Sequence, residues 1–281
     1  MKKVKIGVVG LGYVGKAIEA YFKRFYNLNT FDINVESSCS SLDQLVSLSD
    51  IIFICLPTPM RKDGSTDLRI IDSVIQDINS IANRDSNKLV VIKSTIPVGT
   101  TNRFIKKNDK IRICFNPEFL TEANYLEDFK NQDRIILGGD NVDALYKLYS
   151  KTFINAEIVK TDCQTAEMVK YVTNSFLATK VSYANEIESF CSHLNIDYNN
   201  MIKIASLDRR LGNSHWNVPG PDGNRGYGGT CFPKDIASLI YQIEQNKMQS
   251  IILKASFNRN NNVDRKEKDW QKLQGRAVSD D

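Results

Sequence analysis

A glycine motif near the N-terminus constrains the fold of this chain more than any other feature. Gly10-Leu-Gly-Tyr-Val-Gly15 directly follows the apolar run Val4–Val9, and apolar residues at helical spacing come after it. Asp32 ends the next expected strand, about 20 residues after the motif, where an acidic side chain can bind ribose hydroxyls. The pattern predicts a strand–turn–helix unit with a dinucleotide site. Glycines that serve packing alone are the alternative.

Each residue of the motif has a physical role in such a site. Gly10 permits the tight turn, Gly12 lets the backbone approach a pyrophosphate, and Gly15 allows close packing of helix on strand. The helix N-terminus favours the anionic group. The charge of Asp32 repels a 2′-phosphate, so we expect NAD rather than NADP as the cofactor.

Strands alternate with helices over the first part of the chain, which predicts an α/β fold with a doubly wound, mainly parallel sheet. After about residue 160 the pattern changes to helices, with one long amphipathic helix expected over Thr165–His193. Further helices are expected at Asn199–Ser206 and Ile236–Met248, on either side of a functional loop, Asn213–Thr230. The expected strands are Val4–Val9, Leu28–Phe31, Ile51–Cys55, Leu89–Lys93, Ile111–Phe115, Arg134–Leu137 and Glu157–Val159.

Three regions follow from these elements. Residues 1–160 are expected to form a Rossmann-like NAD-binding domain, and residues 161–257 a helical domain. Residues 258–281 are polar and rich in lysine, so we expect a tail that is partly ordered at best.

Composition excludes several classes of protein. The net charge of +4 is spread along the 281 residues, which argues against a nucleic-acid-binding protein. No apolar run reaches the ~18 residues of a membrane span. The six cysteines include no C-x-x-C pair and there are only two histidines, so no metal site is expected. These features favour a reducing cytoplasm.

Cys231 stands out among the cysteines because of its surroundings. It follows Gly226-Tyr-Gly-Gly-Thr and precedes a helical stripe that begins at Ile236. A thiol just before a helix N-terminus is stabilised as the thiolate, and Lys234 adds to the effect. Such a thiolate can trap an aldehyde as a thiohemiacetal. Local chemistry alone leaves two alternatives open, namely a small buried apolar residue at 231 and a plain helix cap at Asp235.

Six motifs in order resemble one known family. They are residues 10–15, Leu-Pro-Thr-Pro (56–59), Lys-Ser-Thr-Ile-Pro-Val-Gly-Thr (93–100), Asn-Pro-Glu-Phe-Leu (116–120), Ala-Glu-Met-Val-Lys-Tyr (166–171) with Asn174, and Gly-Tyr-Gly-Gly-Thr-Cys-Phe-Pro-Lys-Asp (226–235). Together they look like the UDP-glucose/GDP-mannose dehydrogenase family, over residues 4 to about 250. The resemblance implies a Rossmann-like domain followed by an α-helical dimerisation domain.

The resemblance also implies a set of catalytic residues. Cys231 would be the nucleophile, while Lys170 and Asn174 would stabilise the developing oxyanion. Asp235, with a water molecule, would assist proton removal. Thr95 and Glu122 would position and activate the water that hydrolyses a thioester.

Binding residues follow from the same resemblance. Those expected at the cofactor are Gly10, Gly12, Tyr13, Val14, Gly15, Asp32, Thr58, Thr95 and Lys234. Those expected at the substrate are Glu118, Phe119, Leu120, Glu122, Lys170, Asn174, Tyr227 and Gly228, with Arg210 reaching the substrate of a neighbouring subunit. A homodimer or larger homo-oligomer is implied.

The expected function is therefore NAD-dependent, four-electron oxidation of the C6 alcohol of a UDP-glucose-like nucleotide sugar. A two-electron dehydrogenase of the 3-hydroxy-acid type and a non-catalytic NAD-binding protein are the alternatives. Family members normally continue into a third domain that holds much of the nucleotide, so this chain resembles a short or truncated form. Trp216 and Arg225 either supply substitute contacts to the nucleotide or simply pack a loop.

Overall fold

The computed structural model describes residues 4–83 and 87–280, which fold into two compact units. The first, called the sheet unit, comprises the chain up to Thr58 together with Leu68–Lys170. The second, called the helical unit, comprises Pro59–Asp67 together with Tyr171–Asp281.

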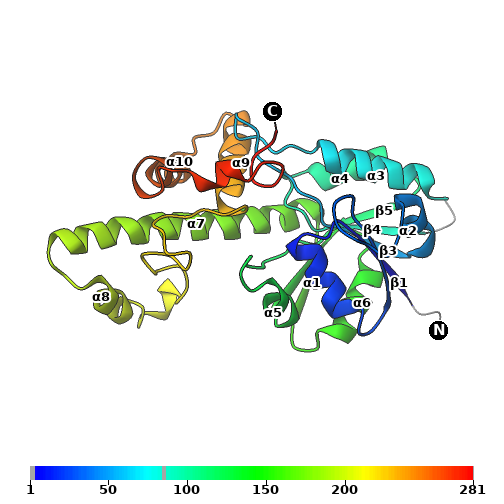
Figure 1. Ribbon diagram of the computed structural model, residues 1–281, viewed down its shortest axis with the longest axis horizontal. Helices are drawn as coiled ribbons and strands as arrows, with labels where there is room; N and C mark the ends of the chain where they lie inside the picture. Colours follow the sequence, from blue (N-terminus) through cyan, green and yellow to red (C-terminus); the bar gives the residue numbers. More distant parts are fainter. Residues whose placement is uncertain (1–3, 84–86, 281) are drawn as a thin grey trace. The chain divides into compact units, whose positions relative to one another are not determined.

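The sheet unit contains a seven-stranded sheet in the order β2-β1-β3-β4-β5-β6-β7 (Figure 1). Neighbouring strands pair in parallel except β5 and β6. The strands are β1 Lys5–Val9, β2 Asn27–Phe31, β3 Ile51–Ile54, β4 Leu89–Ile92, β5 Arg112–Phe115, β6 Arg134–Gly138 and β7 Glu157–Thr161. The helices are α1 Tyr13–Phe22, α2 Leu42–Leu48, α3 Arg69–Ile81, α4 Thr100–Lys107, α5 Tyr125–Lys130 and α6 Asp143–Thr152. The predicted doubly wound α/β fold is confirmed.

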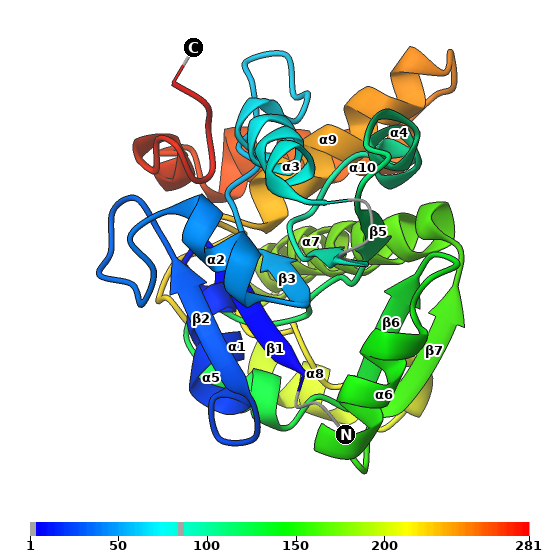
Figure 2. The ribbon, with the colours of Figure 1, turned by 90° about the vertical axis from the view of Figure 1, so that its right-hand side faces the viewer.

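Burial explains why the sequences of the central strands β3 and β4 are continuously apolar. Every residue of β3 and β4 is buried because helices cover both faces of the sheet. Side chains alternate between the faces: Phe53 packs with α1 and α6, whereas Ile52 packs with α2 and α3. Figure 2 shows β3 with α3 on one side of the sheet and α1 and α6 on the other. The arrangement brings the carboxyl ends of β1, β3 and β4 to one edge, where such folds bind ligands.

The helical unit contains most of the long helix α7 Cys163–His193, which begins in the sheet unit. Its other helices are α8 Tyr198–Ala205, α9 Phe232–Gln245 and α10 Ile251–Arg259, followed by a π-helical turn at Asn260–Asp264. Short 3₁₀ turns lie at Arg209–Leu211 and Asp269–Lys272. Residues 213–230 contain neither helix nor strand, as the sequence predicts.

The C-terminal stretch differs from the expectation of a poorly ordered tail. Trp270 and Ala277 are buried, which anchors the stretch despite its polar composition. The stretch also pairs with the hairpin formed by residues 59–67: the Met60 amide donates to Ala277 O at 2.9 Å and the Ser279 amide donates to Met60 O at 2.8 Å. One buried tryptophan and a few backbone hydrogen bonds therefore order this region.

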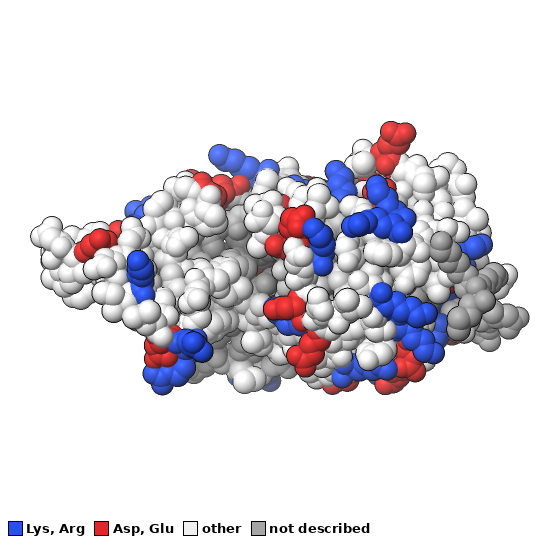
Figure 3. Space-filling view, turned by 90° about the horizontal axis from the view of Figure 1, so that it is seen from below, with Lys and Arg blue, Asp and Glu red and all other residues white. Residues whose placement is uncertain are grey.

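Charged side chains of both signs are interspersed over one face of the molecule, as Figure 3 shows. This agrees with the even spread of charge along the sequence. Within the described ranges, no helix has the length and apolar character needed to cross a membrane.

Candidate active site

Two of the glycines around the turn between β1 and α1 leave no room for a side chain. Gly10 has a φ of +91°, and a Cβ added there would lie 2.6 Å from Cys55 O. A Cβ at Gly15 would lie 1.9 Å from Gly10 O, so any side chain would push α1 away from the turn. The glycines at 10 and 15 are thus steric requirements of the turn.

Gly12 is different, because a Cβ added there would meet no atom within 4 Å. Gly12 is also the N-cap of α1, and no side chain caps this helix end. The first turn of α1, which includes Tyr13 and Val14, places backbone amides at a helix N-terminus, where an anionic group is favoured. The open space at Gly12 leaves room for a pyrophosphate beside this helix end, and the pyrophosphate site itself stays a prediction.

Asp32 does more than the sequence indicates. One carboxylate oxygen accepts a hydrogen bond from the Leu11 amide at 2.6 Å. The other accepts from the amides of Asn34 at 2.7 Å and Val35 at 3.2 Å. The side chain that is predicted to bind ribose thus also fixes the glycine turn to the loop after β2.

Thr58 and Thr95 meet beyond the carboxyl ends of β3 and β4. The Thr58 hydroxyl donates to Thr95 O at 2.7 Å, and both residues are buried. In the same two loops, the Ser94 hydroxyl donates to Leu56 O at 2.6 Å. These bonds fix both predicted cofactor residues at the ligand-binding edge of the sheet.

Lys170 and Glu118 form a buried pair in the sheet unit. Lys170 Nζ donates to Glu118 O at 2.6 Å and to Glu118 Oε1 at 3.1 Å, and only 3% of the lysine side chain is exposed. Burial alone would raise the pKa of Glu118, but Lys170, the Leu120 amide and Lys93 together lower the pKa below its usual value. The Phe119 ring centroid lies 5.4 Å from Lys170 Nζ. The loop predicted to line the sugar pocket is therefore held by the predicted catalytic lysine.

Lys93 was not singled out from the sequence, yet it is buried at this site. Lys93 Nζ donates to Asn116 Oδ1 at 2.9 Å, and the Tyr149 hydroxyl donates to the same oxygen at 2.6 Å. Burial lowers the pKa of Lys93 to about 8. A single lysine directly after the apolar strand β4 is the signal that could have identified it.

Glu167 is a second residue that sequence reasoning missed. Its buried carboxylate accepts hydrogen bonds from the Gly99 amide at 2.5 Å, the Thr101 amide at 2.8 Å and the Thr101 hydroxyl at 2.6 Å. Burial raises the pKa of Glu167 despite these bonds. Glu167 caps the N-terminus of α4 and stands one turn before Lys170 on α7. It therefore joins the helix that bears Lys170 to the loop that bears Thr95.

Cys231 occupies the predicted position in the helical unit. It is the N-cap of α9, it is half-buried, and it forms no disulfide. Its sulfur lies 3.7 Å from Thr230 Oγ1. The positive end of the α9 dipole favours the thiolate form at this place.

Asp235 is not the helix cap that the sequence left open, because α9 begins at Phe232 and Cys231 is its N-cap. Instead, Asp235 is buried in the first turn of α9, where Asn174 Nδ2 donates to its Oδ2 at 2.6 Å. Lys234 Nζ donates to its Oδ1 at 2.5 Å. The structure thus brings together Asn174, Lys234 and Asp235, one turn from Cys231.

The remaining predicted residues are found in different settings. Glu122 is half-buried in the turn before α5, and Tyr227 is buried in the loop before Cys231, next to Gly228. Arg210 extends into solvent with 89% of its side chain exposed, and Asp208 binds it.

Trp216 and Arg225 are engaged by the protein itself. Trp216 Nε1 donates to Gly212 O at 2.8 Å, and Arg225 pairs with Glu188 on α7. The packing alternative for these two residues is therefore favoured over substitute contacts to a nucleotide.

The predicted site residues divide between the two units. The sheet unit contains the glycine turn, Asp32, Thr58, Thr95, Glu118–Glu122 and Lys170, and the helical unit contains Asn174, Arg210, Tyr227, Gly228, Cys231, Lys234 and Asp235. Helix α7 carries both Lys170 and Asn174, one helical turn apart. In the described part of the chain, no cluster of His, Cys, Asp and Glu is arranged to hold a metal ion.

The doubly wound sheet followed by a long helix is a fold that is found in a solved dehydrogenase. A 3-hydroxyisobutyrate dehydrogenase from Mycobacterium tuberculosis shares it, with a TM-score of 0.73 over 91% of this chain and 92% of that one, at 14% sequence identity. An identity this low shows the fold alone.

The family is shown by closer matches. Residues 33–153 match the profile of the UDP-glucose/GDP-mannose dehydrogenase family, NAD binding domain, and residues 164–262 match its central domain. This chain belongs to that family. A UDP-glucose dehydrogenase from Pyrobaculum islandicum has a TM-score of 0.82 and 30% identity, over 92% of this chain and 68% of that one. The UDP-glucose 6-dehydrogenase of Rickettsia bellii is 40% identical over 75% of this chain. The chain spans about half the length (49%) of that relative.

Separate replacements of Gly15 and Gly12 distinguish an effect on folding from an effect on cofactor binding. We expect Gly15→Ala to lower the free energy of unfolding by about 2 kcal/mol or more, because its Cβ clashes with backbone. Gly12→Ala should change stability by less than about 0.5 kcal/mol but weaken NAD binding, since its methyl fills the space for the pyrophosphate. Thermal unfolding and NAD titration measure the two effects. Equal destabilisation by both variants would contradict this account.

The low pKa of Glu118 predicts a pH-dependent stability. A carboxyl group whose pKa is lower in the folded state stabilises the fold above its ordinary pKa, and this contribution is lost as the pH falls through the folded-state pKa. Glu118→Gln should therefore destabilise the protein at neutral pH, by about 1.5–3 kcal/mol, and much less at acidic pH. Denaturant unfolding at several pH values measures the difference. The exposed Glu127→Gln is the control, and a loss that is independent of pH would refute the assignment.

Proposed function

We propose that this chain carries the catalytic centre of an NAD-dependent dehydrogenase that oxidises the C6 alcohol of a UDP-glucose-like nucleotide sugar to a carboxylate. Membership of the family and the UDP-glucose 6-dehydrogenases among its relatives support the substrate class. One observation carries the proposal: the buried hydrogen bond between Asn174 and Asp235, one helical turn from Cys231. It joins two predicted catalytic residues that lie far apart in the sequence.

In this proposal, residues 1–160 bind NAD and residues 161–257 form the helical domain. The open space at Gly12, the N-terminus of α1 and the carboxylate of Asp32 support a site for the pyrophosphate and ribose of NAD. Thr58, Thr95 and Lys234 would complete the cofactor site. Bound NAD would supply the oxidant, accepting one hydride in each of two oxidation steps.

The first oxidation needs a base for the alcohol proton, and Asp235 with a water molecule would take that role. The Cys231 thiolate would then form a carbon–sulfur bond to the resulting aldehyde. The aldehyde oxygen gains negative charge in this step, and the donors Lys170 and Asn174 would stabilise it. The second oxidation converts the thiohemiacetal carbon to a thioester.

Hydrolysis would end the cycle. Thr95 and Glu122 would position a water molecule and remove its proton as it attacks the thioester carbon. The carbon–sulfur bond breaks, the carboxylate leaves and the Cys231 thiolate is restored. Each alcohol converted to a carboxylate would therefore consume one water molecule, transfer two hydrides to NAD and release about three protons.

The sugar would lie against Glu118, Phe119 and Leu120, with Tyr227 and Gly228 on the loop before the nucleophile. Glu118 is already fixed by its bonds to Lys170, so this pocket is organised before substrate binds. Arg210, exposed on the helical unit, would reach the substrate of a neighbouring copy.

A homo-oligomer is part of the proposal. Apolar side chains that are each more than half exposed recur at helical spacing along α7 and form an apolar stripe: Val172, Phe176, Tyr183 and Phe190. Ile204 and Leu207, on and after α8, are also more than half exposed. A second copy of the chain would remove this stripe from water. A reducing compartment such as the cytoplasm, which would keep Cys231 as a thiol, is also part of the proposal.

The number of NADH molecules formed per product tests the function. A screen over UDP- and GDP-sugars, with the product mass measured, should yield two NADH per acid and no free aldehyde. Cys231→Ser should abolish acid formation, while Cys191→Ala, at a buried position near the end of α7, should retain it.

The alternatives predict different results. One NADH per turnover with a ketone or aldehyde product would indicate a two-electron dehydrogenase of the 3-hydroxy-acid type. NAD binding without turnover of any nucleotide sugar would indicate a non-catalytic NAD-binding protein.

The apolar stripe can be tested by charge insertion. We expect Phe176→Glu to dissociate the oligomer, because a carboxylate buried without a partner opposes association. Ile154→Glu, at an exposed apolar position of the sheet unit, should leave the assembly unchanged. Sedimentation velocity measures the size of each species, and an unaltered oligomer in Phe176→Glu would exclude this interface.

A further inference from the structure

The loop Gly226–Thr230, called here the thiol loop, leads directly into Cys231 and is closely packed against the C-terminal stretch. A Cβ added at Gly226 would lie 2.3 Å from Asn260 Oδ1, and one added at Gly228 would lie 2.5 Å from the Arg265 guanidinium carbon. At these two positions, the absence of a side chain therefore makes room for Asn260 and Arg265.

Asn260 holds the backbone of the thiol loop from one side. Its Oδ1 accepts from the Tyr227 amide at 2.8 Å, and its Nδ2 donates to Tyr227 O at 3.0 Å. Asn260 is completely buried, so loss of its side chain removes the protein partners of the Tyr227 amide and carbonyl in the interior. The amide thus pairs with both backbone groups of one residue, as a neighbouring strand would.

Arg265 holds the loop from a second direction. Its guanidinium is buried and packs on Gly228, while Asp222 accepts from Nη2 at 2.6 Å. Asp269 accepts from Nε and Nη2, each at 2.8 Å. The two carboxylates compensate the buried charge and fix the plane of the guanidinium.

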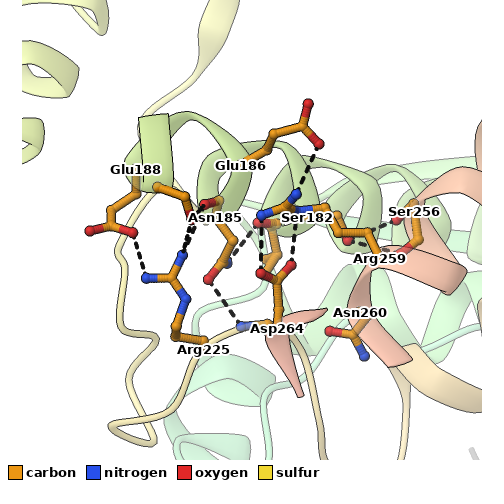
Figure 4. A network of polar contacts seen from close by, with 12 residues as sticks. Ser182, Asn185, Glu186, Glu188, Arg225, Ser256, Arg259, Asn260 and Asp264 are labelled. Carbon is orange, nitrogen blue, oxygen red and sulfur yellow. Dashed lines mark hydrogen bonds and ion pairs between the residues drawn. The ribbon is translucent and has the colours of Figure 1, made fainter. Parts of the chain in front are cut away.

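Helix α7 provides the third attachment. In Figure 4, Arg225 points toward Glu188 and Asn185 on α7, and Arg225 Nη2 donates to Asn185 O at 2.9 Å. The same view shows Arg259 between Glu186 on α7 and Asp264, at 3.2 Å from each carboxylate. The segment that holds the thiol loop is therefore itself fixed to α7.

We propose that Asn260 and Arg265 are positioning residues that fix the thiol loop and so determine how the Cys231 thiol is presented. The inference rests on the proposed function for its catalytic consequence, but the geometry it describes lies wholly within the helical unit. Neither residue belongs to a motif that the sequence analysis identified.

Asn260→Ala tests the first contact, with the exposed neighbour Asn262→Ala as its matched control. Hydrogen exchange of a peptide that covers the thiol loop should become at least about tenfold faster in Asn260→Ala, because the Tyr227 amide loses its acceptor. The pH midpoint of Cys231 alkylation by iodoacetamide should move upward, since a loosened helix start stabilises the thiolate less. In turnover, kcat should fall about 10- to 100-fold, and KM for NAD should change less than about twofold.

Substitutions at Gly228 and Arg265 provide a second test, which remains informative even if the Asn260→Ala variant does not fold. Gly228→Ala places a methyl group against the guanidinium, so it should slow turnover and loosen the loop in the native background. In an Arg265→Ala background the same substitution meets no guanidinium, and its additional effect should largely disappear. Lys266→Ala, at an exposed position beside Arg265, is the control background.

The outcomes separate this inference from the proposed function. Unchanged exchange and alkylation profiles in folded Asn260→Ala, or additive effects of Gly228→Ala and Arg265→Ala, would overturn the positioning role. Altered profiles in a protein that turns over no nucleotide sugar would keep the positioning role and refute the proposed function instead.

Discussion

The hydrogen bond between Asn174 and Asp235 is the contact on which the proposed chemistry depends most. It is buried, so it ties the first turn of α9 to α7 with little competition from water. Cys231 caps that turn of α9, and its position therefore follows from the same contact. The thiol, the carboxylate and the amide are placed by one local arrangement rather than by separate loops.

Much of the fold could be predicted from sequence because the relevant signals are local. The apolar runs of β3 and β4 and the stripe of α7 have the periodicities of their elements. Helix α9 is present as well, but it begins at Phe232, before the Ile236 at which its apolar stripe starts. The glycine turn was also predictable, since Gly10 and Gly15 leave no room for a side chain. Such features depend on neighbours in the chain, which a single sequence contains.

The unpredicted residues act through partners far away in the sequence. Glu167 caps a helix that begins at Thr100, Lys93 binds Asn116, and Asn260 binds Tyr227. A lone polar residue gives no periodic signal, and its partner is defined only when the chain folds. The same reason explains the C-terminal stretch, whose polar composition concealed a buried Trp270 and two residues that hold the thiol loop.

The sheet unit contains charged side chains whose removal from water costs free energy. Lys93, Glu118 and Lys170 are charged groups removed from water, and each needs a charge partner or a hydrogen bond in the fold. Groups of this kind concentrate at functional sites, where a preorganised donor is more useful than a stable apolar core. If these hydrogen bonds persist during turnover, the Lys170 ammonium group stays in one position.

The central claim is that Cys231 becomes covalently bound to the substrate during oxidation. Mass measurement of the protein after acid quenching, with NAD and UDP-glucose as the substrates, tests it most directly. In a Glu122→Gln variant, where hydrolysis is slowed, the account predicts a nucleotide-uronate adduct that maps to Cys231. Continued acid formation by the native protein, with no adduct on Cys231 in the variant at any quench time, would contradict it.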